Sequence, residues 1–171
     1  MWSPSRMAQI QGWLAGLWAG VVLALGGLAA PALFSVLERS VAGTGAGRIF
    51  ALEAYVSLGM CLLMFALERR RVRDAVDAGQ TQSAMSATLL MVLAVLFLTI
   101  FGQHVLHPMI QAARSGQATA FSFGALHGMS AVLYWCKAVL LLVMAWRRTE
   151  TTVLWTAGPE LRWLLAALAA L

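Results

Sequence analysis

The chain has 171 residues, of which 61% are hydrophobic and only 11% are charged. A soluble domain carries about twice that charged share, so the composition excludes a soluble globular fold and indicates a protein embedded in lipid. The net charge of +5 comes from short basic runs beside apolar blocks, such as Arg147-Arg148, which is typical of cations that flank membrane spans rather than of nucleic-acid binding.

The first apolar block carries no charge from Met7 to Leu37. It predicts a helix over 11–30, and about 20 residues is enough to cross a hydrocarbon layer of about 30 Å. We expect Pro31 to interrupt this helix, because proline disfavours a helical residue before it. A cleaved signal peptide is the competing interpretation, but its apolar core is typically only about 7–15 residues long.

The second predicted helix covers 46–67 and carries Glu53. It follows a stretch rich in glycine and alanine, 42–47, which we expect to form a turn with Thr44 as a candidate N-cap. A basic run, 69–73, should end this helix, and a polar loop should follow it.

The third helix is predicted over 84–106, and we expect His107-Pro108 to end it. A loop over 109–123 then leads to the fourth predicted helix, 125–146, which Arg147 and Arg148 close.

The tail has a helix-start pattern at Gly158-Pro159-Glu160. From there to Leu171 a helix would be about 20 Å long, too short to span the bilayer, so we expect it to lie on the membrane surface. The predicted fold is therefore all-α: an integral membrane four-helix bundle over 1–150, followed by a tail, 151–171, with a short interfacial helix.

The arginines are distributed unequally between the two sides of the predicted bundle. With four spans, the N-terminus, the central loop and the tail share one side, which holds eight arginines, whereas the other side holds three. Cytoplasmic segments carry the excess of basic residues, so both termini are predicted to be cytoplasmic and the protein to lie in the cell membrane. The eight are Arg6, Arg69, Arg70, Arg71, Arg73, Arg147, Arg148 and Arg162; the three are Arg39, Arg48 and Arg114.

Small residues recur every four positions along the first helix, at Gly12, Gly16 and Gly20. Such a ridge lets another helix approach closely and gain van der Waals contact in lipid. It predicts a packing surface for a neighbouring helix of the bundle, the favoured interpretation, or else for a second copy of the chain or another membrane protein.

The fourth helix carries a polar stripe at spacings of three, four and three residues, which places its members on one face. A lysine in mid-membrane costs about 2.5–3.5 kcal/mol on insertion scales, so Lys137 should face the bundle, with Glu53 as its best partner. The pair, together with Ser57, either fixes helix register, which we favour, or lines a path for a proton or a small polar solute. The stripe consists of His127, Ser130, Tyr134 and Lys137.

Three histidines, His104, His107 and His127, fall near one end of the predicted bundle. Imidazoles at helical spacing can hold a metal or clamp a haem, so a metal- or haem-binding redox protein is the alternative function. No acid accompanies them as in a metalloprotease motif, and we expect neither a metal nor a cofactor. Cys61 and Cys136 lie in apolar blocks outside any CxxC motif, which indicates packing residues.

Several short motifs, in order and spacing, resemble the transmembrane protein 205-like family. Pro31-Ala-Leu-Phe34 followed by two glycines resembles its first hairpin, Leu106-His107-Pro108 its Leu-x-Pro, and Leu126-His-Gly-Met-Ser130 its His-Gly-x-Ser. The resemblance covers 12–146 and implies a small four-helix membrane protein with no assigned reaction. By motif, it singles out Pro31, Phe34, Gly43, Gly47, Pro108, His127, Gly128 and Ser130.

This chain departs from the family pattern at Tyr134, where members often have asparagine. Copper-resistance proteins and four-helix haem proteins usually also place histidines in the first helix, and this chain has none there. No hydrolase elbow, phosphate loop or dinucleotide fingerprint is present. We therefore expect a non-enzymatic multi-pass membrane protein with a structural or transport-associated role, whose surroundings are the lipid bilayer.

Overall fold

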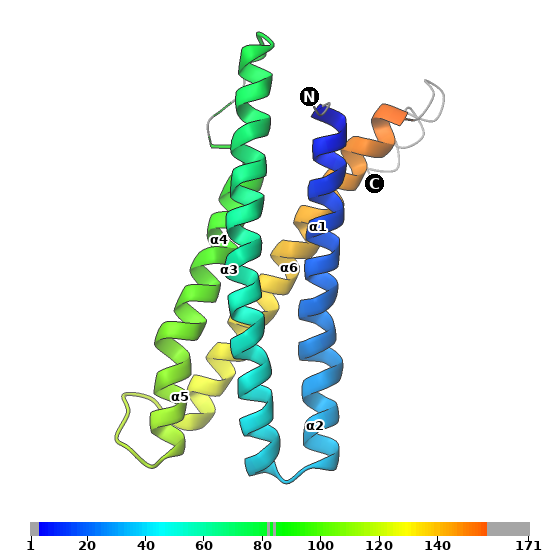
Figure 1. Ribbon diagram of the computed structural model, residues 1–171. Coiled ribbons are helices and arrows are strands. Elements are labelled where there is room, and N and C mark those ends of the chain that lie inside the picture. The colour runs from blue at the N-terminus through cyan, green and yellow to red at the C-terminus, as the bar shows by residue number, and fades with distance from the viewer. Residues whose placement is uncertain (1–3, 82, 84, 157–171) are drawn as a thin grey trace, which may run out of the picture.

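Figure 1 shows the computed structural model, which describes residues 4–81, 83 and 85–156. Within these residues four helical segments are long and apolar enough to cross a membrane. The protein is thus an all-α four-helix membrane bundle, as predicted. The four segments are Arg6–Val36, Arg39–Asp77, Ala87–Arg114 and Phe123–Arg148.

Two of the four segments consist of more than one element, joined without a break. The first comprises α1 (Pro4–Ala24), a π-helical turn η1 (Leu25–Ala29) and α2 (Ala30–Val36); α3 (Arg39–Asp77) is the second. The third comprises α4 (Ala87–Phe101), a π-helical turn η2 (Gly102–Leu106) and α5 (His107–Arg114), and α6 (Phe123–Thr156) is the fourth.

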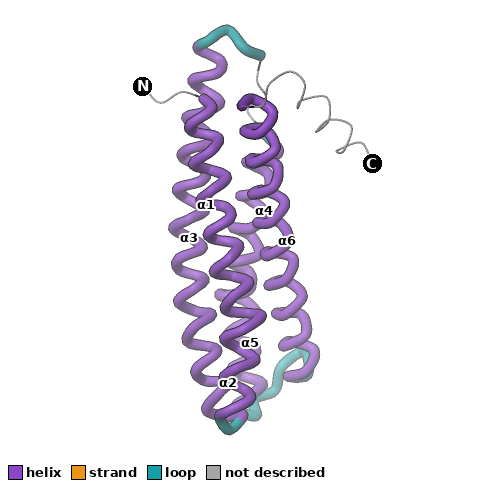
Figure 2. The backbone as a smooth tube through the Cα atoms, turned by 90° about the vertical axis from the view of Figure 1, so that its right-hand side faces the viewer, coloured by secondary structure: helices purple, strands orange, loops and turns teal. Residues whose placement is uncertain are grey.

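The helices run alternately up and down, so the connections alternate between two ends (Figures 1 and 2). We call one end the basic end (residues 4–11, 68–86 and 148–156) and the other the hairpin end (residues 30–42 and 107–125). α1 packs against α6 and α3, and α4 packs against the same two helices. Consequently α3 and α6 face each other across the bundle. Which end faces the cytoplasm stays a prediction.

Pro31 and Pro108 both lie inside helices, so the helix interruptions predicted at these two prolines are wrong. A proline lacks one backbone N–H, and its ring crowds the carbonyl four residues earlier. Here η1 and η2 each end two residues before the proline. A π-helical turn widens the helix and shifts its hydrogen-bond register, which makes room for the ring. The two helices therefore continue beyond their predicted ends, to Val36 and Arg114.

The predicted turn at 42–47 is also wrong, because α3 begins at Arg39 and is helical throughout this stretch. Thr44 is not an N-cap; its hydroxyl donates to the carbonyl of Ser40, one turn earlier, at 2.9 Å. The glycines serve packing instead. A Cβ on Gly43 would lie 3.1 Å from the guanidinium of Arg114, which itself donates to the Ser40 carbonyl at 2.6 Å.

The second and fourth helices also exceed their predicted ends. α3 continues through the basic run to Asp77, and α6 continues past residue 150 to Thr156. The interfacial helix predicted after Gly158 lies outside the described residues, and the division of the chain at residue 150 stays a prediction.

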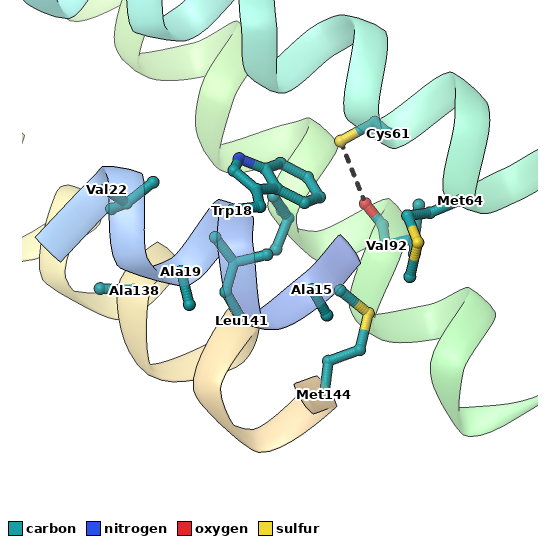
Figure 3. Packing of buried hydrophobic residues seen from close by; sticks show 11 residues of the cluster. Ala15, Trp18, Ala19, Val22, Cys61, Met64, Val92, Ala138, Leu141 and Met144 are labelled. Carbon is teal, nitrogen blue, oxygen red and sulfur yellow. Dashed lines mark hydrogen bonds between the residues drawn. The ribbon is translucent and has the colours of Figure 1, made fainter. Parts of the chain in front are cut away.

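The apolar core fills the middle of the bundle, and Figure 3 shows α1 meeting α6 through Ala15 and Ala19. Both alanines are fully buried, and they are four residues apart. Close approach of α1 and α6 therefore depends on an alanine ridge rather than on the predicted glycine ridge. The core comprises Ala15, Trp18, Ala19, Val22, Cys61, Met64, Val92, Val95, Ala138, Leu141 and Met144.

The glycine ridge is mostly on the outside of the bundle. Gly12 is buried, but Gly16 and Gly20 are exposed, and a Cβ on either would meet nothing within 4 Å. The favoured interpretation, packing within the bundle, is therefore wrong for these two, because α1 is turned so that Ala15, Trp18 and Ala19 face inward. Contact with a second copy or another membrane protein through this ridge stays a prediction.

At one glycine, Gly26, a side chain of α6 lies close against the backbone of η1. A Cβ on Gly26, within η1, would lie 2.5 Å from Cε1 of Tyr134. The hydroxyl of that tyrosine donates to the carbonyl of Val22 at 2.7 Å, which anchors α6 to α1. The ring cannot move away from a new methyl group without giving up this hydrogen bond.

We therefore expect Gly26→Ala to lower the free energy of unfolding by about 1–3 kcal/mol, as overpacking does. Gly20→Ala is the matched control, because its methyl group meets no neighbour and alanine is the better helix former. Thermal unfolding of both variants in one detergent measures the difference. Equal unfolding midpoints for the two variants would contradict this account of Gly26.

Candidate functional site

Glu53 of α3 and Lys137 of α6 form an ion pair near the middle of the bundle. Nζ of Lys137 donates to the two carboxylate oxygens of Glu53 at 2.9 and 2.7 Å. The side chains are only 3% and 5% exposed. The predicted partners are therefore in contact, and the long lysine side chain reaches across the bundle from one helix to the other.

Three further side chains surround this pair, and we call all five residues the central cluster. The Ser57 hydroxyl donates to Glu53 Oε1, and Nε1 of Trp18, on α1, donates to Ser57 Oγ at 2.9 Å. Nζ of Lys137 lies 5.0 Å from the ring centroid of Tyr134, in cation–π range. Buried charges are tolerated when they are paired and hydrogen-bonded, and the carboxylate of Glu53 satisfies both conditions.

The polar stripe of α6 only partly joins the central cluster. Lys137 is buried, Tyr134 and Ser130 are half-buried, and His127 is exposed at the hairpin end. His127 stacks on Phe123 with ring centroids 6.0 Å apart. The stripe thus passes from an exposed end into the buried pair, but His127 and Ser130 lie outside the cluster itself.

The three histidines are not brought together into a metal site. His104 and His127 are exposed, and His107 is hydrogen-bonded to Gln111, with Nε2 atoms 3.3 Å apart. Within the described part of the chain no three side chains of His, Cys, Asp or Glu are grouped to hold a metal. The π-helical turn η2 also alters the spacing on which an i,i+3 pair of ligands depends.

The positions singled out by family resemblance have several roles. Pro31 and Pro108 follow the π-helical turns, and the Gly43 and Gly47 backbones lie beside side chains of α5. Phe34 and Gly128 are exposed, and nothing in the described structure explains them.

A second buried polar cluster lies near the basic end and was not predicted. Its centre is Glu68, which is fully buried about 22 Å along α3 from Glu53. Arg71 donates to the two carboxylate oxygens at 3.0 and 2.8 Å, and Arg148 of α6 donates to one at 2.6 Å.

Residues from the other helices complete this second cluster, which we call the end cluster. The Gln11 amide, on α1, donates to Glu68 at 3.0 Å, and the Ser86 hydroxyl donates at 2.5 Å. Ser86 also caps α4 by accepting from the Leu89 N–H at 3.1 Å. Arg148 donates in addition to Thr88 Oγ1 at 2.8 Å. The end cluster (Gln11, Glu68, Arg71, Ser86, Thr88 and Arg148) therefore joins all four membrane-spanning segments.

The sequence contains a pattern that indicates the burial of Glu68. It continues the buried face of α3 after Ser57, Cys61 and Met64, at spacings of four, three and four residues. A predicted helix end at residue 67 concealed this periodicity, because the acid then belonged to an exposed basic run.

α6 repeats the pattern of α3 across the bundle. Lys137, Leu141, Met144 and Arg148 are all buried and follow the same spacings of four, three and four residues. On each helix two polar residues therefore enclose two apolar ones. The inner residues belong to the apolar core, so a layer of apolar side chains lies between the central cluster and the end cluster.

Glu68→Gln should lower the free energy of unfolding by about 3–5 kcal/mol, because it removes the buried carboxylate that buried Arg148 and half-buried Arg71 share. Arg70→Gln is the control: it breaks an ion pair with Asp74 that is exposed and 3.9 Å long, worth at most about 1 kcal/mol. Chemical unfolding in detergent, followed by circular dichroism, compares them. The central role of Glu68 fails if both variants unfold at the same denaturant concentration.

Residues 13–119 match the model of a family described as a domain of unknown function (DUF4149). The match covers the first three membrane-spanning segments except the first turns of α1, and it includes both acids of the two clusters. No curated protein and no solved structure matches the chain. The chain belongs to the DUF4149 family of domains of unknown function.

Proposed function

We propose that this protein is a non-enzymatic structural module of the membrane, in which two buried ion pairs hold α3 and α6 in one register. The observation that carries this proposal is the matched order of polar and apolar residues on these two helices. Each of the two buried acids of α3 meets a buried base of α6, although α3 and α6 are not among the helix pairs that pack closely.

The register follows from the energetics of charge in a bilayer. Sliding α6 by one turn, about 5.4 Å, would separate both pairs at once. Glu53, Lys137 and Arg148 would then be buried without their counter-charges, and Glu68 would keep only Arg71, on its own helix. Buried ionic groups contribute little net stability, and fixing register is their best-attested structural use. The apolar side chains between the two clusters favour this role over a conduit.

The resemblance to the transmembrane protein 205-like family supports the same proposal, because it implies a small four-helix membrane protein without an assigned reaction. We also propose a location in the cell membrane with both termini cytoplasmic. The distribution of arginine supports this. Arg6, Arg69, Arg70, Arg71, Arg73, Arg147 and Arg148 lie in or next to the basic end, whereas only Arg39, Arg48 and Arg114 lie in or toward the hairpin end.

A second candidate is a proton path that includes the central cluster. Lys137 is the one lysine of the chain, and the other eleven basic residues are arginines. A buried lysine can lose its proton, whereas arginine keeps its charge. Transfer of a proton from Lys137 to Glu53 would neutralise both groups, and the stripe from His127 leads to them from the hairpin end.

Stability measurements test the structural role. We expect Lys137→Met to lower the free energy of unfolding by about 3–5 kcal/mol, because it leaves the Glu53 carboxylate buried without its counter-charge. The double variant Glu53→Gln/Lys137→Met should be close to wild type, since a neutral pair of similar volume replaces the ionic one. A double variant as unstable as the single variant would reject this account of the pair.

Flux measurements separate the two candidate functions. Proteoliposomes containing wild type or the folded double variant, loaded with a pH-sensitive dye, report proton entry under an imposed gradient. The structural proposal expects equal rates. A wild-type rate well above that of the double variant would establish the proton path and displace the structural proposal.

A further inference from the structure

The arginines of the basic run on α3 differ in whether a carboxylate neutralises them. Arg70 is paired with Asp74, and Arg71 is paired with Glu68. Arg69 and Arg73 are exposed, and among the described residues neither takes part in an ion pair or a side-chain hydrogen bond. Two uncompensated guanidinium groups thus lie one helical turn apart on the same side of α3.

These two arginines continue the outward face of α3. Leu62 and Ala66 are exposed on that face, and Arg69 and Arg73 follow them at spacings of three and four residues. In a membrane-spanning helix, exposed apolar side chains contact lipid, so this stripe leads from the acyl chains to two cations. Figure 1 shows α3 extending beyond the start of α1 here, where a helix leaving the bilayer passes the head groups.

The chemistry of the pair fits a phosphate. Guanidinium groups present forked donors that match phosphate oxygens, and residues four apart on a helix have Cβ atoms about 5–6 Å from each other, close enough to share one anion. Ala66, one turn nearer the membrane centre, adds no bulk beneath them. A zwitterionic lipid brings its own cation, so two uncompensated charges favour a lipid with net negative charge.

We propose that Arg69 and Arg73 bind the phosphate of an anionic phospholipid, whose acyl chains lie along Ala66 and Leu62. The hairpin end has no equivalent pair among its described residues. Arg114 donates to the Ser40 carbonyl, while Arg39 and Arg48 are nine residues apart and so lie on opposite faces of α3.

Lipid titration of the full-length protein in detergent, followed by native mass spectrometry, tests this site. Phosphatidylglycerol should bind more tightly than phosphatidylcholine. Arg69→Gln/Arg73→Gln should weaken phosphatidylglycerol binding by about 25-fold, since each arginine near an anionic surface contributes about fivefold. Arg70→Gln, which removes the same kind of charge from another face of the same turn, is the control and should bind as wild type does.

Equal binding of phosphatidylglycerol by the double variant and the control would overturn the proposal, as would equal binding of both lipids by wild type. Soluble glycerol phosphate should not compete at lipid concentrations, because it lacks chains to contact Leu62; competition would reject a lipid as the occupant. Both arginines are exposed, so the double variant should unfold at the wild-type temperature. If it does not, the two single variants, each expected about fivefold weaker, carry the test.

Discussion

Charge that lies inside an apolar bundle must find its counter-charge there, and the arrangement of this protein depends on that requirement. Lipid supplies almost no hydrophobic drive between helices, so close packing and polar contacts decide which faces meet. The alanine ridge at Ala15 and Ala19 lets α1 approach α6. The two buried acids of α3, Glu53 and Glu68, then pair with bases on α6, across the bundle. Close packing joins neighbouring helices, and the two ion pairs join α3 and α6, which are not among the closely packed pairs.

Pro31 and Pro108, which in a soluble protein would favour turns, lie inside helices here. A helix that ended within the membrane would leave backbone groups unsatisfied in hydrocarbon, which is costly. The π-helical turns keep the chain helical past Pro31 and Pro108. One of them also brings Gly26 against Tyr134, so the same turn that accommodates a proline helps to anchor α6 beside the central cluster.

The two clusters contain different bases, arginine in the end cluster and lysine in the central cluster, and this difference separates a structural role from proton transfer. The end cluster contains only arginine as its base, so its charge is permanent and its contribution is structural. The central cluster contains lysine, which leaves proton transfer open to experiment. Outside the bundle, Arg69 and Arg73 remain uncompensated because Glu68 and Asp74 already engage their neighbours. Because Glu68 and Asp74 are paired with other arginines, Arg69 and Arg73 stay available to the lipid surface.

The sequence by itself determined the four membrane-spanning blocks and the pairing of Glu53 with Lys137. Both follow from local properties: length of apolar sequence matches bilayer thickness, and few partners exist for a charge in hydrocarbon. Only the tertiary structure decided which side of α1 faces inward, so that Gly16 and Gly20 lie outside and Ala15 inside. It also decided that Glu68 is buried and that both prolines stay helical. The burial of a side chain depends on the neighbouring helices that cover it and supply its hydrogen-bond partners. A single segment of sequence does not contain that information.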